Sequence, residues 1–174
     1  MGYMAKNTFF IRATVSAPVA GTYAQTEIDL GSYTSLGSSK PEVLRIHNVQ
    51  NLMTDNAGMA PALEGDKIAD FAWQLTTQSQ SDIVLITDDS WVSGGVGAVR
   101  NPDSSDTIAG TQAFESQILA QDFVAGYVVA VPSLFLGAKI GDKFDEAVSF
   151  SILLECTTEP MSKANAVSLA ISQQ

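Results

Sequence analysis

The sequence predicts an all-β sandwich that ends in a short helix. Between residues 147 and 157, apolar and polar side chains alternate, which is the period of a strand with one buried face. The apolar row consists of Val148, Phe150, Ile152, Leu154 and Cys156. Similar short alternating stretches recur along the chain, separated by segments rich in Gly, Ser and Pro. About eight strands with little helix favour one antiparallel Greek-key sandwich over residues 1–174.

The first half of the chain contains four alternating stretches and one continuous apolar run. The alternating stretches predict strands at residues 8–15, 26–30, 42–52 and 69–79. In the last of these, Phe71, Trp73 and Leu75 form the apolar row, so we expect Trp73 in the core. The run at 83–87 is typical of a strand buried on both faces. Residues 54–66, with their Gly and Pro, predict a surface loop.

The second half of the chain contains a long segment rich in glycine and ends in a helical pattern. Residues 88–108 predict the longest irregular stretch, in which the glycines at 94, 95 and 97 form a flexible turn. The pattern of residues 112–119 does not decide between a helix and a strand. We expect one strand over 125–140, broken or bulged at Pro132, because proline donates no hydrogen bond to a ladder. Ser162 is placed to cap a helix over 161–171 that docks on the sandwich.

Composition narrows the class of protein. The 174 residues include 19 acidic and 9 basic side chains, a net charge of −10, which argues against binding a nucleic-acid backbone. The single cysteine, Cys156, excludes an intramolecular disulfide and lies in an apolar row, so we expect it in the core. Residues 1–15 contain no long apolar run and Lys6 departs from the myristoylation pattern, so neither a secretion signal nor a lipid anchor is expected.

Candidate chemistry is sparse. The only histidine, His47, lies in a strand pattern, and no nucleophile motif accompanies it, so we expect no enzyme and no cofactor. Carboxylates could bind calcium through hard oxygen ligands, although they lack the spacing of an EF-hand, so a bound cation and a solvated acidic loop both remain open. The carboxylates in question are Asp88, Asp89, Asp103 and Asp106. Trp91, beside the first two, is the better exposed aromatic for stacking on a sugar.

The pattern at 127–137, the strand at 150–155 and the tail at 161–171 resemble single jelly-roll capsid proteins of icosahedral viruses. The resemblance implies an eight-stranded antiparallel jelly-roll sandwich with a short C-terminal helix, located in the virion. Its partners would be copies of itself and other capsid proteins. Exposed apolar residues such as Met53, Met59 and Leu63 would then be buried by neighbouring copies.

The resemblance has one departure and two alternatives. Many small coat proteins neutralise the genome with an Arg-rich arm, whereas residues 1–15 carry only Lys6 and Arg12. We therefore expect no direct contact with nucleic acid, and an inner membrane layer or a separate basic protein facing the genome. The main alternative is a carbohydrate-binding or adhesin module that uses residues 88–108 and Trp91. A sandwich hydrolase is a third, for which no acid–base pair stands out.

Overall fold

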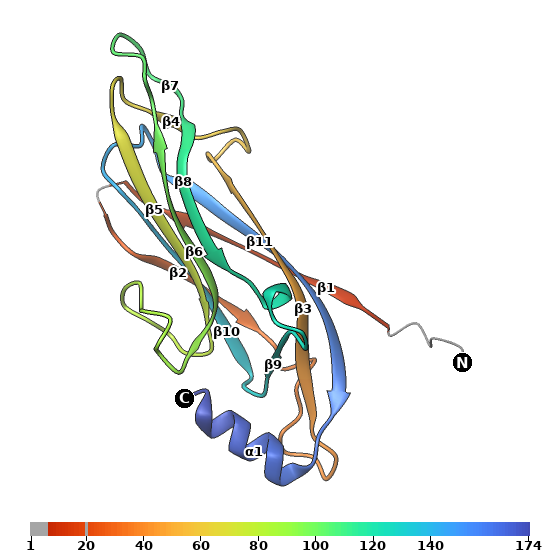
Figure 1. The fold of residues 1–174 in the computed structure, drawn as a ribbon. Coiled ribbons are helices and arrows are strands. Elements are labelled where there is room, and N and C mark those ends of the chain that lie inside the picture. Colours follow the sequence, from red (N-terminus) through yellow and green to blue (C-terminus); the bar gives the residue numbers. More distant parts are fainter. Residues whose placement is uncertain (1–6, 20) are drawn as a thin grey trace.

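The computed structural model describes residues 7–19 and 21–174, which form two antiparallel sheets, a two-stranded ribbon and a C-terminal helix (Figure 1). Lys6 therefore lies outside the described residues. The four-stranded sheet has the order β1-β11-β3-β9 and the five-stranded sheet the order β2-β10-β5-β6-β8. The strands are β1 (Phe9–Ala17), β2 (Ala24–Asp29), β3 (Glu42–Thr54), β4 (Ala62–Leu63), β5 (Ile68–Thr76), β6 (Trp91–Arg100), β7 (Ile108–Ala109), β8 (Thr111–Ile118), β9 (Tyr127–Val129), β10 (Ser133–Ile140) and β11 (Val148–Pro160). The ribbon is β4-β7, and a short 3-10 helix spans Ala120–Asp122.

Strand pairing identifies the type of sandwich. Strand β1 pairs with β11, β2 with β10, β3 with β9 and β5 with β6, all antiparallel, as in one long hairpin. Pairing of β11 with β3 and of β10 with β5 rolls this hairpin into two sheets. This is the jelly-roll arrangement, so the predicted fold class is confirmed. Strand β8 is an addition at the edge of the five-stranded sheet, beside β6.

The core lies between the inner faces of the two sheets. The predicted apolar row of β11 is buried throughout, from Val148 to Cys156. Opposite it, Phe71 of β5 packs against Phe150, with ring centroids 5.9 Å apart. Trp73 is also buried, which confirms its expected place in the core. Each large side chain removed from water in this layer contributes about 1.5–3 kcal/mol to folding.

The glycine run predicted as a flexible turn is instead part of β6, and that prediction was wrong. Gly97 lies opposite Phe71, and Gly95 lies opposite Trp73, in the β5·β6 register. A Cβ atom on Gly97 would lie 2.7 Å from Phe71 Cε1, so the ring occupies the space that a side chain would need. The aromatic rings of the neighbouring strand β5 therefore cover the backbone of these two glycines.

Two further predictions of strands were wrong in location. Residues 83–87 do not form a buried strand but part of the loop at 77–90, where Leu85 is 78% exposed. The strand expected over 125–140 is broken at Pro132, as one of the two alternatives had it, but its two parts, β9 and β10, belong to different sheets. The Pro132 carbonyl accepts a hydrogen bond from the Leu30 amide at 2.7 Å, which extends the pairing of β2 with β10 by one residue, so the chain has already joined the five-stranded sheet at Pro132. Residues 112–119, left open, belong largely to β8.

The C-terminal helix α1 (Lys163–Ser172) closes one end of the sandwich. Its N-cap is Ser162, as predicted, whose hydroxyl accepts a hydrogen bond from the Asn165 amide at 3.3 Å. The helix buries Ala166 and Ala170 in a small second core, against Val43 and Ala130. No helix within the described ranges is long and apolar enough to cross a membrane.

Candidate assembly surface

The outer face of the five-stranded sheet carries exposed apolar side chains where β6 meets β8. In the β6·β8 register Ala98 lies opposite Phe114 and Val96 opposite Ser116, so these side chains share one face. The other face, toward Gly97, is the one that Phe71 covers. On the outer face Val96 is 46% exposed and Phe114 56% exposed. The folded monomer therefore leaves an aromatic and a branched aliphatic side chain side by side in water.

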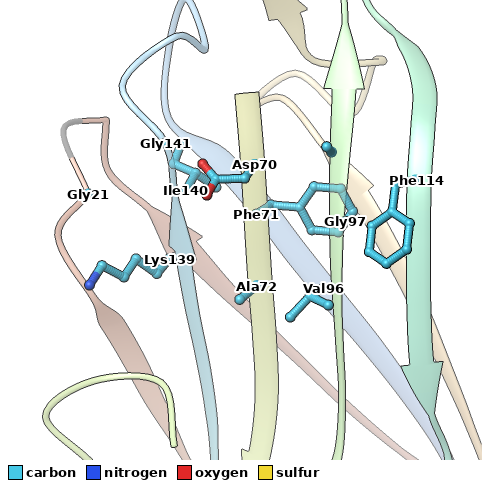
Figure 2. Close-up of a pocket in the computed structure, with 11 residues that line it drawn as sticks. Gly21, Asp70, Phe71, Ala72, Val96, Gly97, Phe114, Lys139, Ile140 and Gly141 are labelled. Carbon is cyan, nitrogen blue, oxygen red and sulfur yellow. The ribbon is translucent and has the colours of Figure 1, made fainter. Parts of the chain in front are cut away.

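A groove of about 530 Å³ runs along this outer face. Its apolar lining includes Ala72, Val96 and Phe114, and Figure 2 shows the last two projecting from neighbouring strands. Asp70 and Lys139 line its other side. The Lys139 ammonium is already paired with the Asp82 carboxylate at 3.0 Å, so the groove has an apolar wall on one side and the Asp70 carboxylate on the other.

The loop at 77–90 packs over part of the same outer face, where the buried side chain of Gln74 holds it by hydrogen bonds. The Gln74 amide donates to the Tyr23 hydroxyl at 2.9 Å and to the Asp82 carbonyl at 3.1 Å. Its oxygen accepts from the Val84 amide at 2.8 Å. Burial of the Tyr23 hydroxyl raises its pKa, an effect that the hydrogen bond with Gln74 partly offsets and the Asp82 carboxylate reinforces. These hydrogen bonds hold the backbone of the loop at Asp82 and Val84 against β5.

A second groove, of about 260 Å³, lies between this loop and strands β6 and β8. Trp91, Ile83 and Ile118 are among its lining residues, with Ser116 and Gln117. Trp91 is half-buried whereas Trp73 is buried, so the expectation that Trp91 is the more exposed tryptophan is confirmed. Trp91 begins β6 rather than standing in an irregular loop.

The sheet edges differ in how they are closed. At β9, the Gln173 side chain donates to the Val128 carbonyl at 2.7 Å and accepts from the Ala130 amide at 3.0 Å. Where β3 extends past β9, the Gln121 side chain makes the same double contact with the Val49 backbone, at 2.9 Å for both bonds. These amides take the place of a missing strand.

The remaining edges are β1, β2 and β8. Strands β1 and β2 contact each other along one side of the sandwich, where the Thr26 hydroxyl donates to the Thr14 carbonyl at 3.3 Å. Strand β2 also carries the charges of Glu27 and Asp29, which discourage further pairing. All eight residues of β8 are exposed, and no strand of the described chain pairs with its outer edge. The backbone of β8 is therefore available to a partner.

The outer face of the four-stranded sheet offers a smaller apolar area. A groove of about 520 Å³ is lined there by Arg12, Leu52 and Leu153, among others. The Arg12 guanidinium lies over the Phe10 ring, 5.9 Å from its centroid. Leu52 and Phe10 are both exposed.

The candidate calcium ligands do not come together. Asp88 precedes β6 and Asp103 follows it, and ten residues of strand separate the two by roughly 33 Å. The Asp88 carboxylate accepts hydrogen bonds from the Ser90 hydroxyl and amide, and Asp103 accepts from Ser105 in the same way. These bonds lower the pKa of both carboxyls, and each pair of bonds stabilises a turn. Across residues 7–19 and 21–174, no three His, Cys, Asp or Glu side chains gather in a metal-binding arrangement, and Asp89 and Asp106 do not alter this.

The other residues that the sequence singled out have structural roles. His47 Nε2 lies 2.8 Å from the Thr157 hydroxyl on the sheet. Cys156 is buried, as expected, and burial raises the pKa of its thiol to about 12, with a further contribution from Glu155. Among the three apolar residues expected to be exposed, Met59 is exposed and Leu63 is fully buried. Met53 is partly buried against the core. The expectation of exposure was wrong for Leu63, whose side chain in β4 points into the core.

The nested pairing defines a jelly-roll sandwich of the kind found in viral capsid proteins, and solved structures agree. VP1 of Trichodysplasia spinulosa-associated polyomavirus, in complex with GM1 oligosaccharide, matches 91% of this chain and 97% of its own at 8% identity, with a TM-score of 0.50. VP1 of Merkel cell polyomavirus, from a virus-like particle, matches 94% and 77% at 6% identity, with a TM-score of 0.47. No protein-family model and no curated protein sequence matches the chain. At 8% identity, the likeness to the first of these structures shows a shared fold.

Proposed function

We propose that this chain is a structural coat protein that self-associates into a viral shell. The observation that carries the proposal is the apolar outer face of the five-stranded sheet, where Val96, Phe114 and Ile118 stand exposed beside the open edge of β8. Contiguous exposed apolar surface beside an unpaired strand is typical of a protein that meets a partner there. The fold shared with polyomavirus VP1 supports a shell as the setting.

The proposed location is the virion, with copies of the chain and other capsid proteins as partners. The net charge of −10 disfavours a genome-facing role, because phosphate neutralisation needs clustered Lys and Arg. An inner membrane layer or a separate basic protein would face the genome instead. The proposed role is structural rather than catalytic, with residues 1–174 acting as one domain.

The test is the mass of the purified chain by light scattering across protein and salt concentration, with electron microscopy of any large fraction. We expect concentration-dependent oligomers or closed particles. Added salt should favour them, because it screens the repulsion between acidic copies. Phe114→Asp should shift the chain toward monomer, whereas Ile171→Asp, an equally drastic change on the exposed side of α1, should act less. A strict monomer at all concentrations, alone and with its co-expressed virion proteins, would refute the proposal.

One observation favours the carbohydrate-binding alternative enough to test it. Trp91 lines the 260 Å³ groove together with the polar side chains of Ser116 and Gln117, a combination suited to stacking on a sugar ring and binding its hydroxyls. Because Trp73 is buried and Trp91 is half-buried, quenching of the tryptophan fluorescence reports mainly on Trp91. Saturable fluorescence changes and a raised Tm with sialylated or neutral oligosaccharides, lost in Trp91→Ala, would support this function. Flat titrations would exclude it for those sugars.

A further inference from the structure

Among the strands of the described residues, β8 is the least protected edge. It is eight residues long, contains no proline and carries one charge, Glu115. Natural sheets normally protect such edges with Lys, Pro, bulges or a covering segment. This chain uses covering side chains at β9 and β3, through Gln173 and Gln121, but not at β8. One bulge is present, at Ala113, where the register with β6 shifts. The stretch from Phe114 to Ile118 beyond the bulge is regular.

The regular stretch has a sequence that complements itself. Read antiparallel about Ser116, Phe114 of one strand lies opposite Ile118 of the other, and Glu115 lies opposite Gln117. Cross-strand pairs of an aromatic with a branched aliphatic side chain stabilise a sheet, and an amide donates to a carboxylate. A register centred on Glu115 would instead place two carboxylates in contact, which is destabilising. The sequence therefore favours the register centred on Ser116 over the register centred on Glu115.

The alternation of side chains along β8 places the apolar pair and the polar pair on opposite faces of the sheet. Phe114, Ser116 and Ile118 share the outer face of the sheet, as the pairing of Phe114 with Ala98 and of Ser116 with Val96 requires. Glu115 and Gln117 lie on the opposite face, where both are exposed. Pairing about Ser116 would thus join the exposed apolar side chains of two copies into one continuous surface.

From the open edge, its near neutrality and its self-complementary sequence, we propose that β8 pairs antiparallel with β8 of a second copy about a two-fold axis at Ser116. The two five-stranded sheets then form one continuous sheet across the pair. The partner is a second copy because a chain of net charge −10 approaches its own kind most easily through a segment with one charge per strand. This inference deepens the proposed shell function and rests on it for its setting.

The first test traps the contact covalently. Opposite residues of an antiparallel pair have Cα atoms about 4.5–5.5 Å apart, within the range that a disulfide spans. Under mild oxidation of the full chain, Ser116→Cys should therefore yield a covalent dimer. Ile118→Cys is the matched control, because its two copies would lie four residues out of register, roughly 13 Å apart. The native Cys156 is buried and does not compete.

The second test adds a charge of either sign to the Ser116→Cys chain. Gln117→Glu places a carboxylate opposite Glu115 twice in each dimer, and Gln117→Lys places an ammonium there. We expect the rate of disulfide cross-linking to fall with Gln117→Glu and to rise with Gln117→Lys, by about two- to thirtyfold from two such pairs. Gln50→Glu and Gln50→Lys, exposed changes on the other sheet, correct for the altered net charge.

The outcomes separate the two proposals. Equal cross-linking of the Ser116→Cys and Ile118→Cys chains, or charge variants at 117 that act no differently from those at 50, would overturn pairing about Ser116. Particles or capsomer-like oligomers without a disulfide-linked dimer of the Ser116→Cys chain would leave the shell function standing and remove this contact. A disulfide-linked dimer of that chain, with nothing larger formed, would support the contact and count against the shell.

Discussion

Gly97→Ala is the substitution that most directly tests how β6 is built. In an ordinary strand, alanine in place of glycine restricts the unfolded chain and stabilises. Here the added Cβ would meet the Phe71 ring and would lie 2.7 Å from the Phe114 carbonyl oxygen as well. Neither group can withdraw freely, because Phe71 is packed on Phe150 and the Phe114 carbonyl belongs to the backbone of β8. We expect destabilisation of about 1–3 kcal/mol, typical of overpacking.

The assay is thermal and urea unfolding of the purified variant. For a chain of this length 1 kcal/mol corresponds to about 2–4 °C, so Tm should fall by about 2–12 °C. Gly37→Ala is the matched control: a Cβ there meets nothing within 4 Å, so its stability should stay level or rise by about 0.4–1 kcal/mol. Phe71→Leu in the Gly97→Ala background should cost less than the sum of the single changes, since both act on one contact. Equal Tm values for Gly97→Ala and Gly37→Ala would refute this account of the glycine.

Three further expectations concern a buried amide, the thiol and two carboxylates. Gln173→Ala should cost about 1–3 kcal/mol in unfolding measurements, because it leaves the Ala130 amide without its partner, whereas an exposed change at Gln174 should be neutral. Cys156, buried and with a pKa raised to about 12, should resist thiol reagents at pH 8 in the native protein and react fully once urea unfolds it. Hydrogen bonds lower the pKa of Asp88 and Asp103 below 3.8, so the stability that these carboxylates contribute is present above pH 3.8 and is lost as pH falls through their folded-state pKa values. Replacing both residues with Asn should therefore make the free energy of unfolding less dependent on pH at the acid end. An unchanged dependence on pH would contradict this expectation.

Sequence reasoning succeeded where structure is decided locally. The alternation from Val148 to Cys156 reflects one buried face, and β11 has that face along its whole inner length. The cap at Ser162 is a contact with Asn165, three residues away, so the sequence contains all of it. Trp73 was predicted correctly for the same reason, because its row in β5 is apolar without interruption from Phe71 to Leu75.

Prediction failed where a distant strand decides. The glycines of β6 read as a turn because their cover comes from β5, which the local sequence does not show. The apolar run at 83–87 read as a buried strand, yet it lies on the outer face, fastened by Gln74. Tyr127–Val129 and Ser133–Ile140 read as one strand because nothing before Pro132 reveals that the chain changes sheets. The sequence did not reveal the candidate assembly surface, because the pattern of residues 112–119, which form most of β8, fits a helix and a strand equally well.

The nested pairing also has a consequence for how the chain is made. Strand β1 pairs only with β11 within its sheet, so β1 must wait for the synthesis of the last of the described strands. At ordinary rates of synthesis that delay is on the order of ten seconds. During it, Ile11 and Val15 have no sheet to enter and stay open to wrong partners. Because β5 and β6 are neighbours in sequence, we expect their hairpin to form early, and we expect the four-stranded sheet, which depends on distant contacts, to close late. A chain cut short before β11 would therefore keep β1 without its neighbour in the four-stranded sheet.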